Sequence, residues 1–173
     1  MRVDNDILIP ELARLLNEGK EVRFTPSGVS MRPFIEGDQD SVILAPLTQE
    51  PCIGDILLVR VTTPQSPITN NQSPITNHQS PTIYVLHRLI RIEGSIHQTS
   101  NIKHQTFILQ GDGNLQGEEH CRREDIIGRV KRIEYPSGRR KCLTRGRLWH
   151  CLFPLRRWLL KIYRHSWLKC FYK

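Results

Sequence analysis

Leucine residues near the N-terminus recur at the spacing of one helical face. They are Leu8, Leu12, Leu15 and Leu16. Residues three and four positions apart lie on the same side of an α-helix, so the pattern predicts a helix over residues 6–19. Pro10 suits its first turn, where the missing N–H is not needed, and Gly19 suits its C-terminal cap. We expect this short amphipathic helix to pack on the rest of the domain.

Before residue 139, most of the remaining apolar residues fall in short runs rich in β-branched side chains, which is typical of strands. The runs lie at residues 22–24, 41–45, 56–61, 82–92, 107–110 and 126–133. Glycine-aspartate pairs precede two of them, at Gly37-Asp38 and Gly54-Asp55, and such pairs commonly form turns. The succession of strands and turns predicts a mostly β, antiparallel fold with one short N-terminal helix.

The longest run, residues 82–92, contains a histidine among apolar residues. Because side chains alternate along a strand, His87 is expected to share a face with Val85 and Leu89. The other face is expected to carry Leu86, Ile90 and Ile92. Apolar surroundings favour the neutral imidazole, which is the form that a general base needs. The same position is also typical of a core histidine with a satisfied hydrogen bond, and taken alone the pattern favours that second interpretation.

A serine lies where the backbone is expected to turn sharply. In Gly28-Val29-Ser30-Met31-Arg32-Pro33 the glycine can adopt a positive φ, and the proline fixes φ and lacks a donor. We therefore expect the Ser30 side chain to be presented rather than buried. A serine hydroxyl is a weak nucleophile at neutral pH, so a catalytic role needs a base that accepts its proton. His87 is the candidate for that base.

Residues 65–81 repeat a polar heptad that contains Gln-Ser-Pro-Ile-Thr-Asn. Such copies do not form a core, and each proline interrupts a strand ladder. We interpret the segment as a flexible insertion between two strands of a single domain at residues 1–138. Residues 139–173 form a tail.

The positive charge of the chain is concentrated in this tail. The net charge is +8, and the 11 lysines and arginines of residues 135–173 have no acidic residue among them. Over residues 149–172, apolar and aromatic residues recur close to one helical face, with basic residues largely on the other. This predicts a basic amphipathic C-terminal helix on an anionic membrane surface. Docking on the chain's own domain is the second interpretation. A nucleic-acid arm is the least favoured, because phosphates would not use the apolar stripe.

The cysteines and the hydropathy exclude several classes of protein. Cysteine occurs 5 times, an odd number, without a C-x-x-C pair, so we expect reduced thiols and neither a disulfide framework nor a zinc site. No metal or other cofactor is expected. No segment reaches the roughly 18 to 20 apolar residues of a membrane span, and the N-terminus lacks the apolar core of a secretory signal. These features predict a cytoplasmic protein that is peripheral on a membrane surface if the tail binds lipid.

Six short motifs occur in the order found in type I signal peptidases, and the chain resembles this family from residue 24 to residue 133. It is similar to the branch of the endoplasmic reticulum, archaea and spore-forming bacteria, in which histidine replaces the lysine general base. The same clan contains the self-cleaving repressor peptidases. The motifs are Gly28-x-Ser30-Met31-x-Pro33, Gly37-Asp38, Gly54-Asp55-Ile56, Val85-Leu86-His87-Arg88-Leu89-Ile90, Leu109-Gln110-Gly111-Asp112-x-Asn114 and Ile127-Gly128-Arg129-Val130.

The resemblance implies a serine endopeptidase on a signal-peptidase-like β domain. Ser30 matches the nucleophile and His87 the general base, while Met31 and Pro33 shape the turn. The Ser30 hydroxyl would attack the scissile carbonyl as His87 accepts its proton and later returns it to the leaving amine. The backbone amide of Ser30 would stabilise the oxyanion. The substrates would be leader or signal-like peptides in preproteins, cleaved after a small residue.

The sequence does not decide which acidic residue orients His87, because it departs from the family pattern after the Gly-Asp-Gly-Asn turn. Asp112 matches the aspartate of the family's turn, and Glu118 stands where the orienting aspartate is expected. We take these two as alternatives and Asp125 as the third candidate.

Two further departures bear on function. Gly28 stands where signal peptidases usually have a serine, as in the repressor peptidases, which leaves Ser27 as a substitute hydroxyl for the oxyanion hole. No segment before the serine motif is expected to act as the family's membrane anchor. The alternative function is therefore a non-catalytic relative that binds a membrane surface or nucleic acid as a regulatory protein. The presence of both Ser30 and His87 favours the peptidase.

Overall fold

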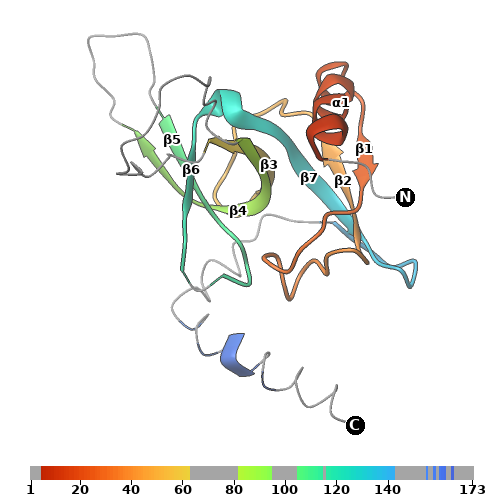
Figure 1. The fold of residues 1–173 in the computed structure, drawn as a ribbon, viewed down its shortest axis with the longest axis vertical. Helices are drawn as coiled ribbons and strands as arrows, with labels where there is room; N and C mark the ends of the chain where they lie inside the picture. Colours follow the sequence, from red (N-terminus) through yellow and green to blue (C-terminus); the bar gives the residue numbers. More distant parts are fainter. Residues whose placement is uncertain are drawn as a thin grey trace, which may run out of the picture.

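The computed structural model describes residues 5–62, 82–94, 105–114, 116–142, 155, 158, 160–162 and 165. Its strands are β1 (Val22–Phe24), β2 (Ser41–Ala45), β3 (Ile56–Thr62), β4 (Thr82–Gly94), β5 (Gln105–Gln110), β6 (Glu119–Cys121), β7 (Ile126–Glu134) and β8 (Arg140–Cys142). All pair antiparallel in the order β1-β2-β7-β3-β4-β5-β6, with β8 on β7 (Figure 1). The mostly β, antiparallel fold expected from the sequence is confirmed. Strands β6 and β8 were not expected.

Helix α1 (Asn5–Asn17) is the predicted N-terminal helix, with one difference at its start. It begins early enough that Pro10 lies inside the helix rather than in its first turn. At its end Gly19 adopts a φ of 81°, and the Gly19 amide donates to the Leu16 carbonyl at 2.9 Å. The Lys20 amide donates to the Leu15 carbonyl at 3.1 Å, which completes the paired bonds of a Schellman cap. The glycine cap expected from the sequence is therefore present.

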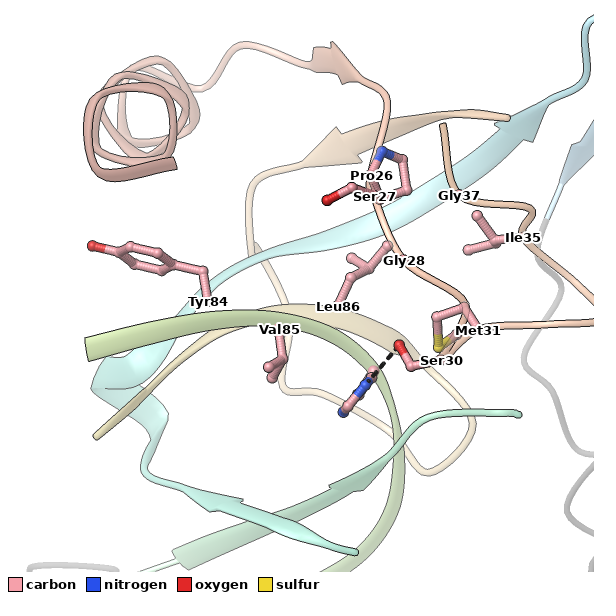
Figure 2. Close-up of a pocket in the computed structure, with 11 residues that line it drawn as sticks. Pro26, Ser27, Gly28, Ser30, Met31, Ile35, Gly37, Tyr84, Val85 and Leu86 are labelled. Atoms are coloured by element: carbon pink, nitrogen blue, oxygen red, sulfur yellow. Dashed lines mark hydrogen bonds between the residues drawn. The ribbon is translucent and has the colours of Figure 1, made fainter. Parts of the chain in front are cut away.

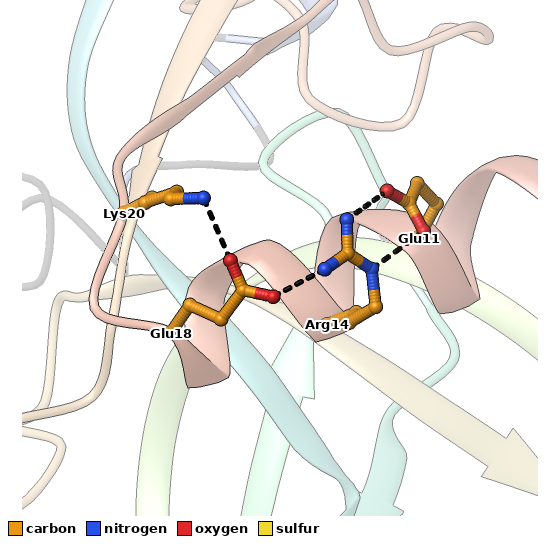
Figure 3. Close-up of polar contacts among 4 residues, drawn as sticks. All are labelled: Glu11, Arg14, Glu18 and Lys20. Atoms are coloured by element: carbon orange, nitrogen blue, oxygen red, sulfur yellow. Dashed lines mark hydrogen bonds and ion pairs between the residues drawn. The ribbon is translucent and has the colours of Figure 1, made fainter.

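The apolar face of α1 packs against the sheet. Its buried side chains are Ile9, Leu12 and Leu16, which form one hydrophobic cluster with residues of β2, β3, β4 and β7. The exposed face carries ion pairs, among them Glu11 with Arg14 (Figure 3). Because exposed pairs contribute little to stability, the apolar packing is what holds α1 on the sheet.

Strand β3 lies between two hydrophobic clusters. Ile56 and Leu58 face the cluster under α1, whereas Leu57 and Val59 face a second cluster with residues of β5, β6 and β7. β3 also contacts β6, although β4 and β5 lie between them in the sheet order. The sheet therefore curls around the second cluster, and residues 56–59 of β3 are buried on both faces.

In β4 the predicted alternation of faces holds only as far as Leu89. Val85 and Leu89 pack in the second cluster and Leu86 in the first, as expected. Ile92, expected beside Leu86, packs instead against the second cluster. The reason is a β-bulge: the pairing of β4 with β5 shifts between Leu89 and Arg91, and an extra residue on one strand reverses the faces beyond it.

The ends of β3 and β4 face each other across the repeat segment. Thr62 and Thr82 are direct partners in the pairing of the two strands, while residues 65–81 lie outside the described part of the chain. Replacement of residues 63–81 by a four-residue glycine-containing turn is therefore expected to preserve the hairpin and the fold. The thermal unfolding midpoint, followed by circular dichroism, should stay within about 5 °C of that of the full chain. Loss of soluble, folded protein would contradict the assignment of this segment as an insertion.

Little of the tail falls within the described residues. Beyond β8 the structure describes 155, 158, 160–162 and 165, and the side chains of Leu155, Trp158 and Ile162 are exposed. The membrane-binding helix predicted within residues 139–173 thus stays a prediction. The first residues of that segment belong to the sheet, because β8 pairs with β7. Among the helices that the structure describes, none has the length and apolar character to cross a membrane.

Candidate active site

Ser30 lies in a turn that two glycines shape. Gly28 adopts a φ of 92°, as its place before the serine predicts. It lies directly against Gly37, where an added Cβ would fall 1.9 Å from the Gly28 carbonyl oxygen. The Asp38 amide donates to the Pro26 carbonyl at 2.8 Å. The Gly37-Asp38 turn therefore supports the segment that leads into Ser30. The Ser30 side chain itself is half-buried.

The turn after β5 holds Ser30 from the other side. The Gly113 amide donates to the Ser30 carbonyl at 2.7 Å. At Gly111 an added Cβ would lie 2.6 Å from the same carbonyl oxygen, so a side chain there would displace the serine turn. Met31 packs in the cluster under α1, and Pro33 is exposed. The packing of Met31 and the close approach of Gly111 therefore hold the serine turn, and the role expected for Pro33 stays a prediction.

Strand β4 places His87 against Ser30. The hydroxyl oxygen of Ser30 lies 3.0 Å from His87 Nε2, the contact drawn from Ser30 in Figure 2. His87 Nδ1 lies 2.7 Å from a carboxylate oxygen of Glu119. Because a carboxylate only accepts, Nδ1 carries the hydrogen, and Nε2 of the neutral ring is left to accept the hydrogen of Ser30. The histidine is thus held in the tautomer that a general base needs.

Glu119 reaches the imidazole through the pairing of three strands. It stands in β6 opposite Leu109 of β5, which pairs in turn with Leu89 of β4, two residues beyond His87. The His87 side chain is 6% exposed and that of Glu119 is 22% exposed. The carboxylate therefore faces a nearly buried imidazole, where it can stabilise the positive charge that forms when the ring takes up a proton.

The acids favoured from the sequence lie elsewhere, and this corrects the expected position of the orienting carboxylate. Both oxygens of Asp112 accept from Arg88, at 2.8 and 2.7 Å. Glu118 pairs with Arg91 at 3.3 Å on the surface. Asp125, the third candidate, lies 3.3 Å from the Arg60 guanidinium. The carboxylate on the imidazole belongs to Glu119, the residue next to Glu118.

The Arg88 side chain contacts several of the turns around the site. The sequence did not suggest this structural role. Arg88 is buried with Asp112, and its third nitrogen donates to the Gly54 carbonyl at 2.7 Å. The guanidinium carbon also lies 5.5 Å from the centre of the Phe34 ring. The Arg88 side chain therefore links the turn before β3, the turn after β5 and the segment after Ser30.

A cavity of about 110 Å³ opens beside Ser30 and His87. Ser27 and Gly28, expected near the oxyanion site, line it, and so does Met31. The lining also includes Tyr84, Leu86 and Ile35, which the sequence did not indicate as part of the site. The cavity thus lies between the serine turn and the first half of β4 (Figure 2).

The first half of β4 has an open edge along this cavity. β4 pairs with β3 from Thr82 onwards, but in the part of the chain that the structure describes its pairing with β5 begins only at Arg88. An unpaired edge exposes backbone donors and acceptors to which an extended peptide can add as a further strand. The edge leads directly to His87 and Ser30.

Cys121 lies in β6, the strand that carries Glu119. Burial, together with the smaller effect of the Asp125 carboxylate, raises the pKa of the Cys121 thiol to about 12. That cysteine is therefore a protonated thiol at neutral pH and not a competing nucleophile. Within the described ranges, no cluster of histidine, cysteine and acidic residues has the geometry to hold a metal ion.

No protein-family model, curated protein or solved structure matches the chain. The assignment of the site therefore depends on the geometry of its own residues.

Proposed function

We propose that this protein is a serine endopeptidase of the signal peptidase type, with Ser30, His87 and Glu119 as its catalytic triad. The observation that carries the proposal is the pair of contacts on one imidazole. Nε2 lies 3.0 Å from the serine hydroxyl and Nδ1 lies 2.7 Å from the carboxylate. This is the order of contacts by which a base activates a serine nucleophile and an acid orients the base.

In the proposed reaction, Ser30 Oγ attacks the carbonyl carbon of a peptide bond while its proton passes to His87 Nε2. His87 then gives this proton to the leaving amine, and water hydrolyses the acyl-enzyme by the same route. The Ser30 backbone amide is the first candidate donor to the oxyanion, and one such donor is typically worth about 3 kcal/mol of the barrier. Ser27, which lines the same cavity, is the candidate for a second donor.

The substrate we propose is a leader or signal-like peptide bound in an extended conformation. The open edge of β4 supports this, because it offers backbone groups to a peptide strand next to Ser30. The cavity of about 110 Å³ beside the serine would take the side chain on the acyl side of the scissile bond. Its size favours a small residue there.

A serine-reactive fluorophosphonate probe tests the proposal without a known substrate. We expect the folded chain to be labelled and the Ser30→Ala variant to be unlabelled, because the Ser30 hydroxyl has a histidine base within hydrogen-bonding distance. Heat-unfolded protein is the control, since labelling of an activated serine requires the folded site. Equal labelling of the two chains would overturn the peptidase and leave the alternative, a non-catalytic relative with a regulatory binding function.

A further inference from the structure

A second cavity, here called the α1 groove, lies between α1 and the sheet. Its volume is about 280 Å³, more than twice that of the cavity beside Ser30. Ile9 and Ala13 of α1 form one wall, and Ile126 and Ile127 of β7 form another. The lining also contains the polar residues Asn17, Arg60, Glu124 and Asp125, so the α1 groove combines aliphatic walls with a polar rim.

The α1 groove and the cavity beside Ser30 share one lining residue. Tyr84 lines both cavities, and Figure 2 shows its ring directed away from Ser30. It stands three residues before His87 on β4, which corresponds to roughly 10 Å at about 3.3 Å per residue of strand. A peptide that adds to the open edge of β4 therefore reaches the α1 groove after three or four residues.

The rim of the α1 groove carries charges that are already paired. Arg60, which pairs with Tyr84 across β3 and β4, lies 3.3 Å from the Asp125 carboxylate. The Arg60 side chain is 51% exposed, so this pair lies at the mouth and not on the floor. Aliphatic walls with a neutralised rim fit an apolar side chain better than a charged one.

We propose that the α1 groove binds an apolar side chain of the substrate, four to six residues before the scissile bond. This inference rests on the proposed function and on a substrate that lies parallel to β4, so that its acyl side runs from Ser30 towards Tyr84. The α1 groove then selects among substrates that the small cavity beside the serine does not distinguish.

Two variants of α1 form a matched pair for the test. Ala13→Phe places a ring in the α1 groove, whereas Glu11→Phe places the same ring on the exposed face of the helix (Figure 3). The lost Glu11 pair with Arg14 is exposed, so its removal changes stability little. Ala13→Leu is a smaller replacement that keeps the test available if the phenylalanine prevents folding.

Binding is measured by fluorescence anisotropy with two labelled dodecapeptides in the Ser30→Ala background. Both carry alanine before the scissile position, and they have either leucine or serine at the fourth to sixth residues before the bond. We expect the leucine peptide to bind about tenfold more tightly. Ala13→Phe should abolish this gain, and Glu11→Phe should retain it. Equal affinities for the two peptides, or a gain that survives Ala13→Phe, would overturn the inference.

Cleavage of the same peptides by the chain with Ser30 intact separates this inference from the proposed function. Cleavage without a preference for leucine overturns the role of the α1 groove alone. Leucine-dependent binding without cleavage of either peptide overturns the peptidase and keeps the α1 groove as a peptide site. Absence of binding by both peptides counts against both.

Discussion

Replacement of Glu119 by glutamine is expected to slow the reaction of Ser30 with the fluorophosphonate probe by about 10³- to 10⁴-fold. The carboxylate accepts from His87 Nδ1 at 2.7 Å, which leaves Nε2 free to accept the serine proton. A glutamine amide can donate as well as accept, so it also allows the tautomer in which Nε2 carries the hydrogen. It supplies no negative charge to the protonated ring. The measurement is the second-order rate constant of labelling.

Glu118→Gln is the matched control for this experiment. It is the same chemical change one residue away, at a carboxylate that pairs with Arg91 on the surface. Because that pair does not contact the imidazole, the labelling rate should stay within about twofold of that of the original chain. A large loss in Glu118→Gln with little change in Glu119→Gln would instead support the acid that the sequence favoured.

The sequence could not decide between these two glutamates, because the choice depends on a strand of 3 residues. Neighbouring residues of a strand point to opposite faces, so Glu118 and Glu119 can reach the imidazole only as alternatives. β6 is too short to show an alternating pattern, and its register is fixed by pairing with Leu109 of β5. The contact of Glu119 with His87 depends on this pairing between strands, so it cannot be predicted from the local sequence.

The parts that were predicted have strong local signals. The strands at 22–24 and 41–45 match β1 and β2 at both ends, and the turn at Gly28 has the positive φ that the motif requires. The meeting of Ser30 with His87 was suggested by a family motif and not by periodicity. Periodicity failed at Ile92, because a bulge changes the face of every residue after it and leaves no mark in the hydrophobic pattern.

Asp112 shows how a motif residue can be given the wrong partner. Its place in a Gly-Asp-Gly-Asn turn suggested a carboxylate available to His87, but Arg88, the next residue of β4, takes both of its oxygens. A guanidinium presents two parallel donors that match a carboxylate, so a buried arginine beside such a turn competes strongly for it. In the sequence, Arg88 belongs to the same motif as His87. The motif suggested a catalytic role for His87 but gave no sign that Arg88 would pair with Asp112.

Replacement of Asp112 by alanine is expected to lower the free energy of unfolding by about 3–5 kcal/mol, because it leaves the buried Arg88 guanidinium without its counter-charge. Chemical denaturation followed by circular dichroism measures this change. Glu93→Ala is the control, since it removes one of the two carboxylates that pair with Arg91, in an exposed pair on the same strand as Arg88. Its effect should stay below about 1 kcal/mol.

The double variant Arg88→Met with Asp112→Leu separates the stability of the ion pair from its place in the site. Removal of both charges eliminates the uncompensated guanidinium, so much of the lost stability should return. The links from Arg88 to Gly54 and to the turn that holds the Ser30 carbonyl are lost all the same. We therefore expect a chain that folds but labels slowly with the probe. A double variant as unstable as Asp112→Ala would show that the pair itself stabilises the fold, and full labelling would show that Ser30 is positioned without it.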